Sequence, residues 1–248
     1  MIQATSLLQF SRLSHGFSQV SDGNMDYRFG LQTEVHANRQ RLLGKLGLSL
    51  DHSIQQRGLE ADIHVITPAD KGVGMHGAET GIRANAFITS EPGIGLFLCI
   101  ADCLPIIMYD PTNHVIALLH AARNSTNLNL ASHVVKQLSD QFGTQPRDIW
   151  VAFGPTIRPE SYLFPAEIIN SLVSSEWQPY LSLQPDGRIA VDVAAFNKDQ
   201  LIESGVPVSQ IEDQGLNTRT DPHYFSHVRS QQDHLPEGRF AAVVALKP

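Results

Sequence analysis

LFLCIADCLPIIMYDPTNHVIALLHAARNST, residues Leu96 to Thr126, is the stretch of the sequence that decides the fold. Its apolar runs are separated by short polar turns, a pattern that predicts three successive strands followed by the start of a helix. The second turn, DPTN at residues 110–113, contains a proline, which fixes φ, and Asx side chains, which bond to their own backbone. The pattern therefore places Cys103 and His120 at the ends of neighbouring strands.

Helices and strands are interspersed along the rest of the chain. Val35–Leu46 and Asn129–Phe142 have apolar side chains at helical spacing, and a glycine follows each of them. Residues 38–41 are expected on the solvent side of the first helix, and Pro68–Gly81 is expected to be a loop. A strand pair is predicted within Leu7–Val20, strands at Ala61–Thr67, Arg83–Thr89, Ile149–Phe153 and Phe240–Leu246, and helices at Pro165–Ser174 and Ala194–Ser204. The pattern predicts one α+β (mixed α/β) domain over residues 1–248, with mixed sheets flanked by helices.

Composition and charge narrow the class of protein. A net charge of −7 argues against a nucleic-acid partner, although a few local arginines can still hold a small anion. Cys99 and Cys103 would lie roughly 13 Å apart along a strand, too far for a disulfide, which favours a reducing compartment. No secretory pattern opens the sequence, and no apolar run approaches the roughly 20 residues that cross a bilayer. We therefore expect a cytoplasmic protein without membrane contact.

Cys103 and His120 are the candidate catalytic residues. Each alone is more often a structural residue, but the two together at adjacent strand ends, with Asp102 beside the cysteine, point to chemistry. A thiolate and a neutral imidazole are suitable zinc ligands. A thiolate beside an imidazolium is equally a cysteine nucleophile. The pair alone leaves both interpretations open.

Other side chains are candidates for a third metal ligand or for binding an anion. A third ligand would favour a metal site, and His64, inside the predicted strand, is the better candidate, with His76 in a glycine-rich loop as the alternative. Arg158, in the rigid loop GPTIRP at 154–159, is available to an anion such as phosphate. The sequence lacks GxxxxGK[ST], GxSxG and HExxH, which removes the usual support for nucleotide-dependent kinases and common hydrolases.

The order of short motifs along the chain matches a known family. ADCLPI at 101–106 contains the family's ADCxP signature, and His120-Ala121 opens its HAGWRG signature. The sequence therefore resembles the bacterial laccase-domain proteins, which were named multicopper polyphenol oxidoreductases and later recognised as zinc-containing purine nucleoside phosphorylases. The family's fold is shared with deamidating toxins. The other matching segments are Ser14–Phe17, Asn38-Arg39, Gly154–Tyr162 (GPxI…Y), Val191–Val206 (the late helix) and Phe225–Arg239 (FSxR…GR).

The resemblance implies a metal held by two histidines and one cysteine. Cys103 and His120 fall on two of these positions, and the first histidine normally stands in a QxHG motif. The counterpart assigned here is Asp62-Ile63-His64-Val65, which keeps the histidine but neither the glutamine nor the glycine, and His76 remains the alternative ligand. The HAGWRG motif has become HAARNS, so Arg123 and Asn124 are the candidates at that point for binding substrate or phosphate, together with Arg158.

The function implied by the resemblance is zinc-dependent phosphorolysis or deamination of a purine nucleoside: adenosine, inosine or methylthioadenosine. The expected small-molecule partners are the nucleoside and phosphate, and the expected cofactor is zinc, with copper as the alternative. A metal-activated water would serve deamination.

Three other functions stay open. A cysteine amidase, of the type that edits peptidoglycan precursors, would use Cys103 as nucleophile and His120 as base. A degenerate, non-catalytic metal-binding protein is motivated by the altered HAGWRG motif. A copper polyphenol oxidase is least favoured, because one cysteine and two or three histidines cannot build several copper sites.

Overall fold

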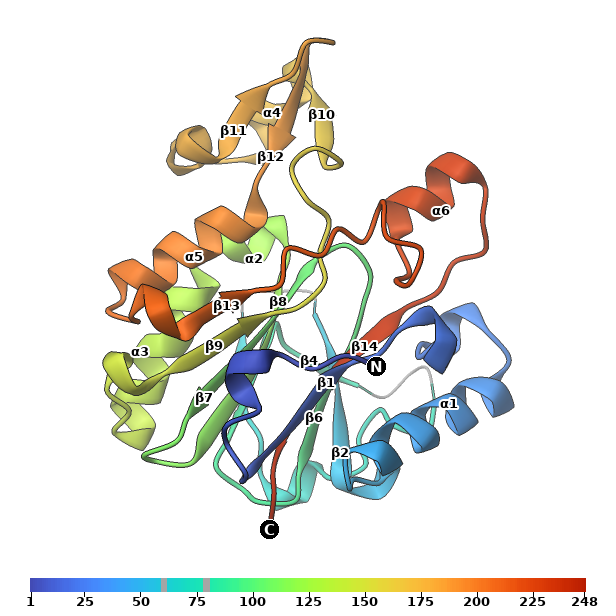
Figure 1. Cartoon of the computed structure of the whole chain (residues 1–248), viewed down its shortest axis with the longest axis vertical. Coiled ribbons are helices and arrows are strands. Elements are labelled where there is room, and N and C mark those ends of the chain that lie inside the picture. The colour runs from blue at the N-terminus through green and yellow to red at the C-terminus, as the bar shows by residue number, and fades with distance from the viewer. Residues whose placement is uncertain (59–61, 78–80) are drawn as a thin grey trace.

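Two β-sheets packed face to face form the centre of the molecule, and helices cover their outer faces (Figure 1). The computed structural model describes residues 1–58, 62–77 and 81–248. Among these residues no helix combines the length and the apolar character needed to cross a membrane. The mixed α/β architecture predicted from the sequence is confirmed.

The first sheet has five strands in the order β1-β14-β6-β2-β4. Strand β14 runs antiparallel to β1 and β6, whereas β2 runs parallel to β6 and β4. Side chains alternate between its two faces, so Leu96 and Leu98 of β6 face the second sheet and Phe97 faces α1. The strands are β1 (Leu13–Phe17), β2 (Ser53–Arg57), β4 (Ile82–Arg83), β6 (Gly95–Ile100) and β14 (Phe240–Leu246).

The second sheet has six strands in the order β13-β9-β7-β8-β5-β3. The antiparallel pair β7 and β8 lies at its centre, with Pro105 opposite His120. The predicted strand–turn–strand–turn–strand segment is therefore present, but its first strand, β6, belongs to the other sheet. The turn at Ala101–Cys103 carries the chain from one sheet to the other. The strands are β3 (Ile63–Val65), β5 (Ala86–Thr89), β7 (Leu104–Asp110), β8 (Val115–Ala121), β9 (Trp150–Phe153) and β13 (Ile211–Asp213).

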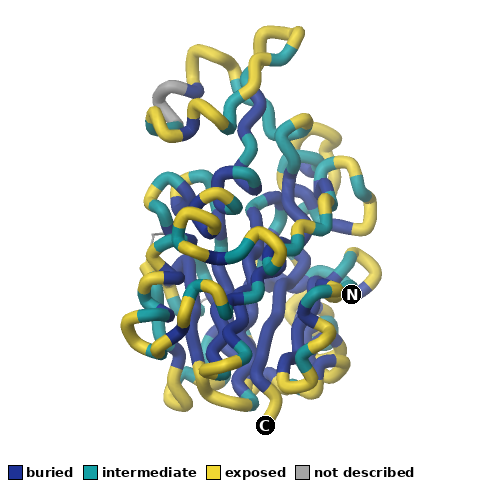
Figure 2. The backbone as a smooth tube through the Cα atoms, turned by 60° about the vertical axis from the view of Figure 1, so that its left-hand side comes forward, coloured by how far each residue is buried: buried dark blue, intermediate teal, exposed yellow. Residues whose placement is uncertain are grey.

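Helices close the core from both sides. Apolar side chains of α1 (Gln32–Lys45) pack on the outer face of the five-stranded sheet, and those of α3 (Leu130–Phe142) and α5 (Val193–Glu203) pack on the six-stranded sheet. The central strands are dark blue in Figure 2 because most of their residues are buried. A small sheet, β10-β12-β11, projects at the top of Figure 1 beside α4. Its elements are β10 (Leu163–Pro165), α4 (Ala166–Leu172), β11 (Leu181–Leu183) and β12 (Arg188–Val191), and the short helices elsewhere are α2 (Arg123–Asn127) and α6 (His227–Asp233).

Three local predictions are wrong. The predicted strand Arg83–Thr89 is divided between β4 of the five-stranded sheet and β5 of the six-stranded sheet. The segment Leu7–Val20 contributes one strand, β1, which pairs with β14 rather than with a neighbour inside the segment. Arg39 does not face solvent but is fully buried, donating to the carbonyl oxygens of Met25 and Gly74. Local helical periodicity gives no sign of such distant acceptors. Ala61, where the predicted strand Ala61–Thr67 begins, and residues 78–80 of the predicted loop lie outside the described residues.

Candidate functional site

Asp102 shapes the turn that presents Cys103. Its backbone has a φ of 73°, a left-handed conformation that aspartate tolerates better than most residues. One carboxylate oxygen accepts from the Thr218 hydroxyl at 2.6 Å, and the other accepts from the Val228 N–H of α6 at 2.7 Å. The backbone oxygen accepts from the Thr156 hydroxyl at 2.7 Å. Asp102 therefore joins the turn to two distant loops and acts as a buried positioning residue.

A pocket of about 380 Å³ opens beside this turn, and both Cys103 and His120 line it. The two candidate catalytic residues are thus brought together as expected from the ends of neighbouring strands. The end of β2 forms another wall, and the loops before α1 and around α6 contribute cationic groups. The further lining residues on which the chemistry depends are Gln56, Arg57, Gly58, Tyr162, Arg28, His227 and Arg239.

His120 is held in its neutral form. Burial lowers its pKa to about 4, so the imidazole carries no charge at neutral pH. Its Nδ1 lies 3.2 Å from Oδ1 of Asn85, and because that oxygen only accepts, Nδ1 carries the proton. The lone pair on Nε2 remains for a ligand or a proton. Gly58 is required here, because a Cβ at that position would overlap both the His120 ring and the Asn85 amide.

Cys103 is also uncharged at neutral pH. Burial raises the pKa of its thiol to about 11, the nearby Asp102 carboxylate adds to the rise, and Arg239 and Arg123 oppose it. Within residues 1–58, 62–77 and 81–248, no hydrogen bond joins Cys103 to His120. The arrangement therefore lacks the thiolate–imidazolium pair that an activated cysteine nucleophile uses.

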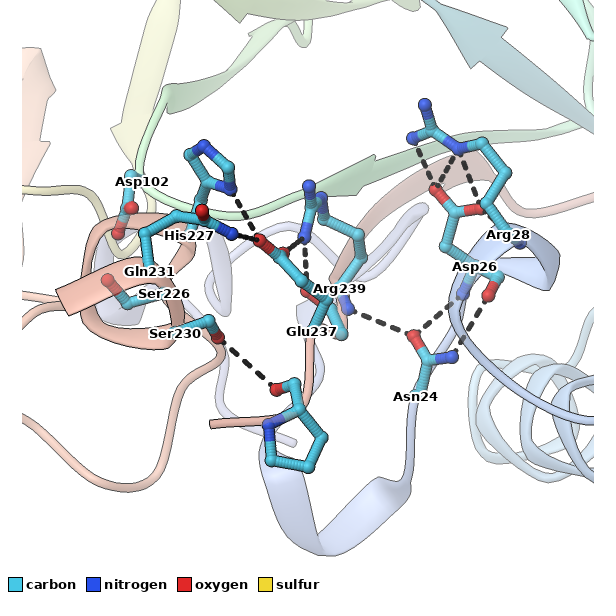
Figure 3. Close-up of polar contacts among 12 residues, drawn as sticks. Asn24, Asp26, Arg28, Asp102, Ser226, His227, Ser230, Gln231, Glu237 and Arg239 are labelled. Atoms are coloured by element: carbon cyan, nitrogen blue, oxygen red, sulfur yellow. Dashed lines mark hydrogen bonds and ion pairs between the residues drawn. The ribbon is translucent and has the colours of Figure 1, made fainter. Parts of the chain in front are cut away.

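The rim of the pocket is a network of paired charges (Figure 3). Glu237 accepts from His227 Nδ1 at 2.6 Å, from Gln231 at 2.9 Å and from Arg239 Nη1 at 2.7 Å. Partial burial favours a higher pKa for this carboxyl, but the three donors outweigh it and hold the pKa at about 2. On the other side, Arg28 pairs with Asp26 at 2.6 Å. The cations at the rim are thus held in place by fixed carboxylates.

The two histidines expected as a third ligand lie elsewhere. His64 is on the edge strand β3, with 44% of its side chain exposed and Nε2 3.8 Å from Asp70. His76 is half exposed and pairs with Asp51 at 3.0 Å. Neither lines the pocket with Cys103 and His120. In the part of the chain that the structure describes, no group of three His, Cys, Asp or Glu side chains is placed to hold a metal ion.

The three residues expected to bind phosphate do not lie together in the structure. Arg158 lies outside the pocket, and its guanidinium forms a bidentate pair with Asp213. Arg123 lines a second, smaller pocket next to Cys103, with Nη1 3.5 Å from the Tyr162 hydroxyl and a buried Nε that finds no hydrogen-bond partner in the described part of the chain. Asn124 is exposed on α2. Only Arg123 is therefore close to the candidate site.

Comparison with known proteins shows the family to which the chain belongs. The sequence profile of the family described as multi-copper polyphenol oxidoreductase laccase matches residues 9–247, and the chain belongs to this family. The purine nucleoside phosphorylase YlmD of Geobacillus stearothermophilus is 32% identical over 225 residues, which are 87% of this chain and 80% of the relative. Relatives carrying the same enzyme name also occur in Bacillus subtilis, at 27% identity over 75% of this chain and 67% of that protein. The relatives' names support an enzyme of the purine nucleoside phosphorylase type.

Solved structures agree with this assignment. The crystal structure of YlmD from Geobacillus stearothermophilus superposes with a TM-score of 0.88 at 29% identity, covering 99% of this chain and 94% of that one. The hypothetical protein YfiH of Bacillus licheniformis gives a TM-score of 0.85 at 25% identity, covering 97% and 94% of the two chains. The resemblance stated from the motifs is therefore confirmed for family and fold.

Sequence reasoning missed the residues at the end of β2. Gln55-Gln56-Arg57-Gly58 lines the pocket and keeps both the glutamine and the glycine of QxHG at the right spacing, with Arg57 where the motif has histidine. The segment around His64 keeps the histidine of the motif but neither flanking residue. A guanidinium is permanently protonated and does not ligate zinc. The described residues thus supply two of the three ligands that the resemblance implies and do not fit a three-ligand zinc site.

Proposed function

We propose that this protein is a purine nucleoside phosphorylase-type enzyme, with adenosine, inosine or methylthioadenosine as nucleoside and phosphate as co-substrate. The observation that carries the proposal is the pocket itself, where Cys103 and His120 meet a rim of fixed cations. The names of the family's relatives support the same reaction class.

The rim is suited to an anionic co-substrate. Arginine binds phosphate through paired N–H donors, and Arg57 and Arg239 both line the pocket. Phosphorolysis places a phosphate oxygen against C1′ of the ribose while the bond to the purine breaks and positive charge develops on the sugar. Guanidinium groups that position phosphate would serve this step through orientation and charge.

The departing purine needs a hydrogen-bond donor. Burial raises the pKa of the Tyr162 hydroxyl, and the same cause raises that of the Cys103 thiol, so both keep their protons at neutral pH. His120, with its proton held toward Asn85, offers the lone pair on Nε2 as an acceptor. Tyr162 and Cys103 are therefore the proposed donors, and His120 is the proposed acceptor for a ribose hydroxyl or a purine N–H.

Phosphorolysis is favoured over deamination and over an amidase. Deamination requires an activated water, for which zinc is the expected activator, and the described ligand set does not fit that ion. An amidase requires a thiolate, whereas burial keeps Cys103 protonated. No contact in the pocket specifically favours either alternative.

The test is release of free base from each nucleoside in the presence and absence of phosphate, followed by chromatography. We expect base release that depends on phosphate, and kcat/KM reduced about 10- to 100-fold by Arg239→Gln. Arg188→Gln is the matched control, because Arg188 is exposed on β12, pairs with Asp186 and does not line the pocket. The proposal fails if none of the three nucleosides yields base while the Geobacillus relative converts them in the same assay.

A further inference from the structure

The position of residue 57 is fixed by its neighbours. Strand β2 pairs in parallel with β6, where Gln56 lies opposite Leu98, and with β4, where Arg57 lies opposite Arg83. The next residue, Gly58, sits so close to His120 that no side chain fits between them. Residue 57 therefore lies next to the residue that contacts the imidazole, at the strand end where the family motif has its histidine; its side chain runs close to Gly81 and lines the same pocket as His120.

The charges around this position disfavour a divalent cation. Arg57, Arg28 and Arg239 line the same pocket, and Arg239 and Arg123 are close enough to act on the Cys103 thiol electrostatically. A metal ion held by Cys103 and His120 would add its charge beside these guanidinium groups, which oppose it even though Asp26 and Glu237 offset two of them.

The nearby carboxylates are already engaged. Both oxygens of Asp102 accept hydrogen bonds, from Thr218 and from the Val228 N–H. Glu237 accepts from three donors at the rim, as Figure 3 shows, and Asp26 pairs with Arg28. None of these three carboxylates is free to complete a ligand set around Cys103 and His120.

A buried amide at the same strand end points to a polar ligand instead. Gln56 is 2% exposed and lines the pocket, yet among the described residues neither its amide oxygen nor its amide nitrogen has a hydrogen-bond partner. Buried polar groups are nearly always paired, so an unpaired amide facing a pocket indicates a ligand with both donor and acceptor atoms.

We infer that this pocket works without a bound metal ion, and that the guanidinium of Arg57 supplies at the third-ligand position the positive charge that a metal would bring. Cys103 and His120 then contact the ligand directly, and an anion such as phosphate binds to arginine rather than to a metal. The inference goes beyond the proposed function, because it concerns what the pocket binds irrespective of turnover.

The test introduces a histidine at position 57, where the family motif has its metal ligand. Wild type, Arg57→His and Arg57→Gln are equilibrated with excess zinc, desalted and analysed for bound metal, and alkylation of Cys103 is mapped by mass spectrometry so that Cys99 is scored separately. We expect substoichiometric zinc in wild type and in Arg57→Gln. Arg57→His should retain stoichiometric zinc, and that zinc should protect Cys103 from alkylation.

Two results would overturn the inference. Stoichiometric zinc in wild type that disappears in Cys103→Ala would show that the pocket binds metal despite Arg57, and this comparison does not depend on how Arg57→His folds. An Arg57→His protein with a native circular dichroism spectrum and no bound zinc would show that residue 57 is not at the ligand position. Neither readout involves turnover, so failure here is distinguishable from failure of the proposed phosphorylase activity.

Discussion

Two walls of the same pocket are built in opposite ways. The Cys103 wall is the turn between two apolar strands, and buried hydrogen bonds to Asp102 fix it from several sides. The β2 wall is a polar strand end, where the buried Gln56 amide has no partner among the described residues and Arg57 carries a charge. The first wall keeps the family's signature, whereas the second departs from it. The departure in the second wall is confined to Arg57, because the flanking Gln55 and Gly58 of the motif are kept.

The largest expected effect comes from breaking the first wall. Asp102→Ala leaves the Thr218 hydroxyl and the Val228 N–H without an acceptor, and it puts alanine at a positive φ. We expect a loss of about 2–4 kcal/mol in the free energy of unfolding, measured by urea denaturation. Asp186→Ala, which removes an exposed carboxylate, is the control and should change it by less than about 0.5 kcal/mol. A small effect at Asp102 would mean that other contacts fix the turn.

The second wall is tested by filling the space beside it. Gly58→Ala forces a methyl group against the His120 ring and the Asn85 amide, so we expect about 1–3 kcal/mol of destabilisation together with displacement of β2 from His120. The control is Gly44→Ala in α1, where a Cβ meets nothing and helix propensity predicts a gain of about 0.5–1 kcal/mol. Thermal melting against wild type should show a lower melting temperature for Gly58→Ala and a higher one for Gly44→Ala. Equal shifts in the two variants would refute the close approach at Gly58.

The smallest expected effect concerns the rim that connects the two walls. Folding lowers the pKa of Glu237 from its ordinary 4.5 to about 2, so its stabilising contribution is fully present above pH 4.5 and is lost as the pH falls toward 2. Because the network is at the surface, we expect the contribution to stay below about 1 kcal/mol. The free energies of unfolding of wild type and Glu237→Gln, measured by denaturation between pH 2.5 and 6, should converge at low pH. A difference between the two proteins that stays constant with pH would contradict the lowered pKa.

The apolar elements could be predicted from the sequence. The strands β7, β8 and β14 and the helices α1 and α3 follow from periodicity and from the turn residues that bound them. Cys103 and His120 were found because the turn signals placed both at strand ends, and that placement depends on local sequence alone.

The polar and long-range features could not be predicted in the same way. Strand β2 reads SIQQR, a sequence without the apolar alternation that identifies strands, and its pairing partners make it a strand. The assignment of β6 to a separate sheet depends on its pairing with β14, far away in the chain. The QxHG position is hard to predict for a different reason: its histidine is replaced by Arg57, and only the flanking Gln55 and Gly58 mark the place, Gly58 through its close approach to His120.

The place of β14 in the five-stranded sheet has a consequence for the order of assembly. This strand, Phe240–Leu246, lies between β1 and β6, so in the described sheet β1 gains its partner only after residues 240–246 have been synthesised. During translation, β6 exposes an unpaired edge next to the turn that carries Cys103. Closure of the sheet therefore depends on contacts of very long sequence separation, which form slowly and leave nascent strands open to mispairing. The pocket is completed only after Arg239 and strand β14 have been synthesised.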